Sequence, residues 1–106
     1  MTIEEIQQEV AAWVSHNFPN HHSWHPILGM QEELGELSHA YLKRTQGVRT
    51  TENHDAAIED AVGDLLIYLL DFCNTQGIDA RDVLHRTWLQ VRKRDWTIDS
   101  AKGDTP

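Results

Sequence analysis

The sequence predicts an all-α fold in which four helices pack as a small bundle and copies of the chain associate as a homo-oligomer. Apolar residues recur at steps of three and four in four separate segments, which is the spacing of amphipathic helices. Sustained alternation of polar and apolar residues is absent, so strands are not expected. With 106 residues, 40 % of them hydrophobic, the chain is long enough for one domain and too short for two.

The expected helices span residues 3–16, 26–46, 55–76 and 80–96. Thr2 followed by Glu5 has the form of a capping box at the start of the first helix. Pro26 comes after a loop rich in Asn, Pro and His, and it suits the first position of the second helix. Gly47 and Gly77 follow the second and third helices, where they suit left-handed caps.

The third and fourth helices are expected to supply much of the core. The middle of the third helix, residues 62–73, is apolar on nearly every side, so we expect it to be the buried centre. Asp79 is expected to cap the fourth helix, with Asp82 in its first turn. The apolar side of this helix, expected to face inward, consists of Val83, Leu84, Thr87, Trp88 and Val91. Trp13, on the apolar stripe of the first helix, is also expected in the core.

Two features favour self-association. The third helix is apolar on more sides than three neighbouring helices can cover, and a chain this short has a limited core of its own. A homodimer or homotetramer would bury the remaining apolar surface. Residues 1–98 are expected to form the domain, and residues 99–106, which are poor in apolar side chains, a disordered tail.

Charge and composition argue against several classes of protein. Nine Lys and Arg residues against seventeen Asp and Glu give a net charge of −8, which argues against non-specific nucleic-acid binding. Cys73 is the single cysteine and cannot form an internal disulfide. The N-terminal residues do not resemble a signal peptide, and the longest apolar run, residues 65–70, is too short to cross a membrane. We therefore expect a cytoplasmic protein without nucleic-acid or membrane partners.

Acidic residues occupy helices whose other residues resemble a core. Glu32, Glu33 and Glu36 project within one or two turns of each other on the second helix. Asp60 and Asp64 on the third helix are about 40° apart around its axis, and an apolar run follows Asp64. Desolvation would cost such carboxylates several kcal/mol, and facing carboxylates repel one another. A Mg²⁺ ion would relieve both effects and bridge to substrate phosphates, whereas solvated, purely structural carboxylates are the alternative.

In this pattern the chain resembles the MazG-like all-α nucleoside triphosphate pyrophosphohydrolases. That family carries two adjacent Glu, a third Glu three residues on, and a later helix with Glu-x-x-Asp before an apolar run. The matching segments are Glu32-Glu33-Leu34-Gly35-Glu36 and Glu59-Asp60-Ala61-Val62-Gly63-Asp64-Leu65-Leu66-Ile67-Tyr68. The family has an acid where Ala61 stands, and Asp60 or Glu59 is its candidate replacement. Gly35 and Gly63 are poor helix formers, which a close approach of the two helices would explain.

The resemblance implies an enzyme that uses Mg²⁺, or Mn²⁺ in its place, to cleave a (d)NTP into a (d)NMP and pyrophosphate, as in nucleotide-pool house-cleaning. Glu33, Glu36 and Asp64 would be metal ligands, with Asp60 as the fourth. Glu32 and Glu33 are the candidate catalytic residues, and Glu32 would ligate the metal or deprotonate the attacking water. Two alternatives stay open: a non-catalytic, metal-binding interaction module, and a phosphoribosyl-ATP pyrophosphatase, which shares the helical scaffold.

Further candidate substrate contacts are Trp24, Lys43, Tyr68, Arg92 and Lys93. Trp24 lies in the loop before the acidic helix, where a nucleobase would stack on it. Lys43 falls on the same side as Glu32, where it would contact a phosphate or pair with surface acids. Tyr68 lies one turn beyond Asp64. Arg92 and Lys93 would capture the triphosphate or simply interact with the C-terminal dipole of their helix.

Overall fold

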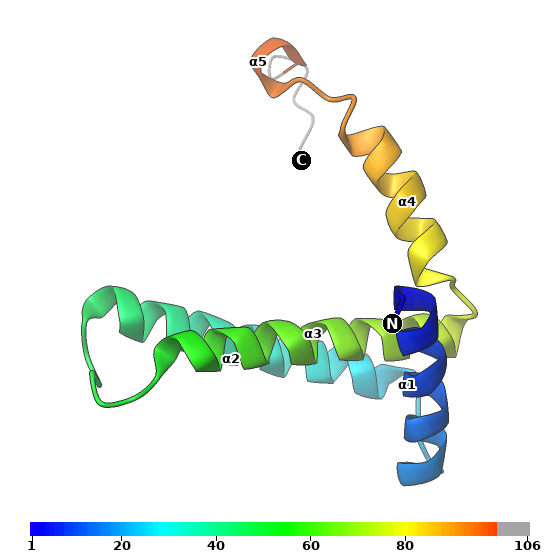
Figure 1. Cartoon of the computed structure of the whole chain (residues 1–106), viewed down its shortest axis with the longest axis horizontal. Helices are drawn as coiled ribbons and strands as arrows, with labels where there is room; N and C mark the ends of the chain where they lie inside the picture. Colours follow the sequence, from blue (N-terminus) through cyan, green and yellow to red (C-terminus); the bar gives the residue numbers. More distant parts are fainter. Residues whose placement is uncertain (100–106) are drawn as a thin grey trace.

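The computed structural model describes residues 1–99, which form helices and no strand (Figure 1). The helices are α1 (Ile3–Asn17), α2 (Trp24–Gln46), α3 (His54–Gln76), α4 (Ala80–Val91) and the short α5 (Trp96–Asp99). The all-α class and the four longer helices are confirmed. None of these helices has the length and apolar character needed to cross a membrane. The predicted tail lies outside the described residues, apart from Asp99 at the end of α5.

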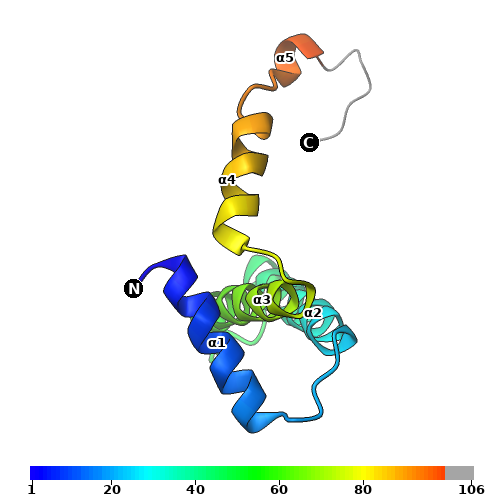
Figure 2. The ribbon, with the colours of Figure 1, turned by 90° about the vertical axis from the view of Figure 1, so that its right-hand side faces the viewer.

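The helices do not close into the predicted four-helix bundle within one chain. Over residues 1–99, α2 and α3 lie antiparallel and form a long hairpin, and α1 crosses one end of it (Figures 1 and 2). Helix α4 contacts α1 and then extends away from the hairpin (Figure 2). The radius of gyration is 17.3 Å, whereas a compact domain of this length has about 13 Å.

Local sequence signals account for most helix ends. The Glu5 N–H donates to Thr2 Oγ1 at 3.1 Å, which confirms the capping box. Gly47 and Gly77 have φ angles of 67° and 65°, which confirms the two left-handed caps. Helix α2 begins at Trp24, so the prediction that Pro26 is its first residue is wrong. The proline still lies in the first turn, where the N–H that it lacks would have no helical partner.

A single glutamine joins α1 to the connection between α3 and α4. Gln7 Nε2 donates to Asn74 Oδ1 at 3.0 Å and to the Ile78 carbonyl at 2.8 Å. Gln7 Oε1 accepts from the Ala80 N–H at 3.1 Å, and Asn74 Nδ2 donates to the Gln7 carbonyl at 3.0 Å. These four hydrogen bonds fix α1 across the end of the hairpin.

The buried core is small, because much of the apolar surface has no cover within the chain. The expectation of a buried α3 centre is wrong for a single chain, since Val62 is 43 % and Leu66 57 % exposed. Trp13 and Trp88 are also more than half exposed, and α4 ends at Val91 instead of continuing to residue 96. The chain exposes 8103 Å² of surface, whereas a compact monomer of this mass exposes about 6000 Å².

Candidate active site

Three predicted acids line one cavity of about 790 Å³ near the end of the hairpin that α1 crosses. They are Glu32, Glu33 and Asp64. The other lining residues come from the end of α1, the connection to α2, the first turns of α2 and the middle of α3. They are Trp13, Val14, Asn17, Phe18, Pro19, Asn20, His21, His25, Leu28, Gly29, Ile67, Tyr68 and Asp71. The cavity therefore combines carboxylates with a largely apolar and aromatic wall.

Glu33 is the centre of the acidic group. Burial raises its pKa, and a hydrogen bond with Glu36 and the negative charges of Glu36, Asp64 and Glu32 raise it further. Its Oε2 atom is shielded from water and has no hydrogen-bond partner among the described residues. A buried oxygen without a donor is unfavourable, and so is a cluster of like charges. A cation at this position would relieve both penalties.

The carboxylate oxygens of these side chains are the ligands that a hard divalent cation prefers, but the side chains do not adopt a metal-coordinating arrangement. Among residues 1–99, no three His, Cys, Asp or Glu side chains converge closely enough to hold a metal ion together. Mutual repulsion separates carboxylates that have no counter-ion between them. Asp60 and Glu59 are exposed, and the charge of neither contributes to the shifted pKa of Glu33. Ala61 is only 3 % exposed, so the position at which the family has an acid is enclosed.

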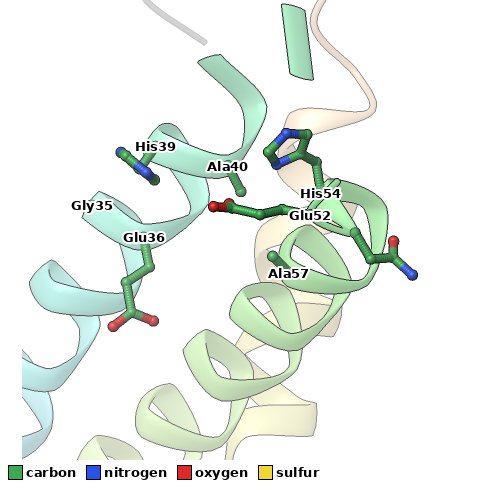
Figure 3. Close-up of a pocket in the computed structure, with 8 residues that line it drawn as sticks. Gly35, Glu36, His39, Ala40, Glu52, His54 and Ala57 are labelled. Carbon is green, nitrogen blue, oxygen red and sulfur yellow. The ribbon is translucent and has the colours of Figure 1, made fainter. Parts of the chain in front are cut away.

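Glu36 also lines a second, smaller cavity of about 390 Å³ toward the other end of the hairpin. Figure 3 shows its side chain extending along α2, away from Glu52 and His54. His54 Nε2 lies 3.0 Å from the Val48 carbonyl, and His39 Nε2 lies 3.4 Å from Arg49 Nη1. Glu36 thus raises the pKa of Glu33, although it lines the smaller cavity and not the larger one.

Tyr68 lines the larger cavity, and its ring is seated against a glycine that the sequence analysis did not single out. A Cβ atom added at Gly29 would lie 2.5 Å from Tyr68 Cζ, so only glycine leaves the ring in this position. Burial raises the pKa of Tyr68, and the nearby acids, first Glu33, raise it further. By contrast, nothing lies within 4 Å of a Cβ added at Gly35 or Gly63. The expectation that these two glycines permit a close helix approach is therefore wrong.

A histidine and an aspartate pair across the wall of the same cavity. His21 Nε2 lies 2.9 Å from Asp71 Oδ2, with the two side chains 17 % and 8 % exposed. The His21 ring also stacks on His25 at a centroid distance of 5.4 Å. Sequence reasoning missed this pair because the residues are fifty positions apart. The available signal was the carboxylate of Asp71 in an otherwise apolar stretch of α3.

The other predicted substrate contacts lie away from the lining of this cavity. Trp24 is 52 % exposed, and its ring centroid is 3.8 Å from that of His25, which does line the cavity. Lys43 lies near the opposite end of α2, where the hairpin turns. Arg92 and Lys93 follow the end of α4, remote from the acids of the same chain (Figure 1).

Comparisons with known proteins give one distant relative. A curated protein named dATP/dGTP diphosphohydrolase, from Cyanophage S-2L, is 28 % identical over 95 residues. The aligned region covers 90 % of this chain and 78 % of that protein. No protein-family profile and no solved structure matches the chain. The aligned region thus includes most of the chain.

Proposed function

We propose that the protein is a nucleotide pyrophosphohydrolase that converts a (d)NTP into a (d)NMP and pyrophosphate. The observation that carries the proposal is the shielded, unpartnered Oε2 of Glu33 among the charges of Glu32, Glu36 and Asp64. Glu32, Glu33 and Asp64 line a cavity of about 790 Å³, a volume typical of small-molecule sites. The resemblance to the MazG-like pattern and the distant similarity to a dATP/dGTP diphosphohydrolase point to the same reaction.

Glu33, Glu36 and Asp64 would hold Mg²⁺, or Mn²⁺ in its place, with Asp60 or Glu59 as a further carboxylate. A bound divalent ion supplies charge neutralisation at the phosphates and lowers the pKa of coordinated water. Glu32 lines the cavity beside these residues and is exposed, so its carboxylate is available to orient the attacking water and accept its proton. No covalent intermediate is required, and burial raises the pKa of Cys73, which keeps that thiol unreactive.

The proposal includes a homodimer or homotetramer. The surface that one chain exposes beyond a compact monomer is about 2000 Å², which matches the size of obligate interfaces. Helix α4 has an uncovered apolar side and is followed by Arg92 and Lys93, which are complementary in charge to the acids of the hairpin. A second copy would cover this helix and bring both cations to the polyphosphate that the first copy binds.

A nucleotide panel with Mg²⁺ tests the reaction. Purine deoxynucleoside triphosphates are the first choice because of the relative's name. The expected products are the monophosphate and pyrophosphate, separated by ion-exchange chromatography. Release of inorganic phosphate and a diphosphate, or no turnover by folded protein supplied with metal, would contradict the proposal. Phosphoribosyl-ATP in the same panel distinguishes that alternative, and Mg²⁺ binding without any turnover would favour the interaction module.

Mixed subunits test the shared site. Glu36→Ala removes an acid, and Arg92→Ala with Lys93→Ala removes the cations. Each variant alone is expected to be nearly inactive. In a mixed dimer, one site would combine the wild-type acids of one subunit with the wild-type cations of the other. Partial recovery of pyrophosphate release after mixing supports a site built from two copies. Absence of recovery in mixtures shown to exchange subunits contradicts it.

A further inference from the structure

Asp71 is a buried charge that the proposed reaction does not use. Asp71 is 5 % exposed, and no other charged residue in the described part of the chain is buried. Its partner is His21, in the connection between α1 and α2, with Nε2 at 2.9 Å and 3.1 Å from the two carboxylate oxygens. Desolvating such a pair costs free energy, so stability alone does not account for it. We therefore ask which side chains the pair holds in place.

His21 is the first member of a row of three neighbouring aromatic rings. Its ring lies 5.4 Å from that of His25 with an angle of 28° between the planes. The ring of His25 in turn lies 3.8 Å from that of Trp24, with the planes tilted by 50°. Asp71 therefore anchors this row to α3, because His21 is the ring that it contacts directly.

The row faces the cavity that contains the acids. His21, His25 and Asp71 line it together with Glu33 and Asp64. Asp64 and Asp71 are seven residues apart on α3, which corresponds to about 10 Å along the helix. A nucleotide whose phosphates lie at the acids can therefore extend its sugar and base along α3 toward the rings.

We propose that the stacked rings of His21 and His25 are the surface on which the nucleobase lies, and that Asp71 positions them by holding His21. The proposal rests on the proposed function in one respect, namely that the phosphates lie at the acids. Planar π-systems favour stacked or edge-to-face contact with a base, and such contacts tolerate different bases. His21 and His25 thus bind substrate, whereas Asp71 is a positioning residue.

Two probes separate the base from the phosphates. One is α,β-methylene dATP, in which the carbon bridge prevents cleavage of the α–β linkage. The other is inorganic tripolyphosphate, which has the charges and no base. Calorimetric dissociation constants with Mg²⁺ are compared for wild type, His21→Ala, His21→Gln, Asp71→Asn and the control His16→Ala. His16 is exposed at the end of α1 and does not line the cavity.

His21→Ala is expected to weaken binding of the methylene analogue about tenfold and to leave tripolyphosphate binding unchanged. Asp71→Asn should cause a smaller loss, because the amide oxygen still accepts from His21. His21→Gln retains an N–H donor for Asp71 and should fold like wild type, while binding the analogue more weakly because it has no ring. His16→Ala should bind both probes normally.

Three results would overturn the proposal. The first is an equal loss of affinity for both probes in His21→Ala, and the second is unchanged affinity for both probes in a folded His21 variant. The third is no binding of the analogue to wild type at millimolar concentration. NMR adds a positional check, because a stacked base shifts the ring C–H signals of His21 and His25, whereas tripolyphosphate does not. If wild type binds the analogue through these rings but does not hydrolyse dATP, the proposed reaction fails and this inference stands.

Discussion

The α2–α3 hairpin and helix α4 are incomplete in opposite ways. The hairpin gathers carboxylates around the shielded oxygen of Glu33, and burial and the negative charges there raise the pKa of this side chain. Helix α4 instead exposes apolar side chains, with Leu84 62 % and Trp88 56 % exposed, and is followed by basic residues. One region therefore lacks positive charge, while the other lacks an apolar partner. The role of charge is therefore tested by changing acids on the hairpin, and the role of apolar area by changing apolar residues on α4.

Removal of one acid from the hairpin should give the largest effect. Loss of a residue that merely supports a metal ligand commonly costs ten- to about a hundredfold in activity, so Asp64→Asn should lose at least about a hundredfold in pyrophosphate release. Because the change also removes like-charge repulsion, the melting temperature in EDTA should stay level or rise. Glu9→Gln, an exposed acid on α1, is the matched control. An Asp64→Asn variant that keeps its activity would remove this acid from the site.

Charges placed on α4 should abolish self-association. Leu84→Glu together with Trp88→Glu puts carboxylates on the apolar side of the helix, where a partner surface would have to desolvate them. Sedimentation velocity should then give the 12.2 kDa monomer, whereas wild type is expected to sediment as a larger species. His85→Glu, on the same helix, adds charge without replacing an apolar side chain. Wild type that is monomeric at high micromolar concentration would break the comparison, since α4 would then need no partner.

The α1 crossing is held by polar contacts, and it should be less sensitive than either region. Gln7→Ala deletes three side-chain hydrogen bonds to Asn74, Ile78 and Ala80. The expected loss is about 2 kcal/mol in the free energy of unfolding, measured in urea. Gln8→Ala removes an exposed neighbour and should change little. Equal stability of the two variants would mean that the crossing does not depend on these bonds.

The smallest effects concern two glycines of α2. Gly29→Ala collides with the Tyr68 ring and should cost about 1 kcal/mol in unfolding free energy. Gly35→Ala meets nothing within 4 Å and should gain up to about 1 kcal/mol from helix propensity. If urea denaturation shows a lower free energy of unfolding for Gly29→Ala and a higher one for Gly35→Ala, the position of Tyr68 over Gly29 is supported. A stabilised Gly29→Ala would show that the ring lies elsewhere.

The sequence was sufficient for the elements whose determinants are local. The Thr2 capping box and the Gly47 and Gly77 caps depend on a few neighbouring residues, and all three were predicted. The placement of α4 and the exposure of Leu66 depend on which surfaces meet, and helical periodicity does not specify that. A stripe of apolar residues indicates that a face needs cover without indicating whether the same chain provides it.

The same distinction applies to the candidate site. Helical spacing groups Glu32, Glu33 and Glu36 on α2, because residues one turn apart share a face. It does not relate them to Asp64 on α3, whose charge acts on Glu33 only because the two helices are packed together. The pairing of His21 with Asp71 joins a loop to a helix, and no spacing rule relates such positions. The seat of Tyr68 on Gly29 likewise depends on how α2 and α3 are aligned along their lengths.

The central claim is that the acids of α2 and α3 share one divalent cation. Mn²⁺ titration of ¹⁵N-labelled protein tests it directly, because the bound ion broadens the amide signals of nearby residues. The account predicts selective broadening over residues 32–36 and 60–68 at low metal concentration, and its loss in Asp64→Asn. Uniform weak broadening, or broadening centred on other acids of the chain, would contradict it.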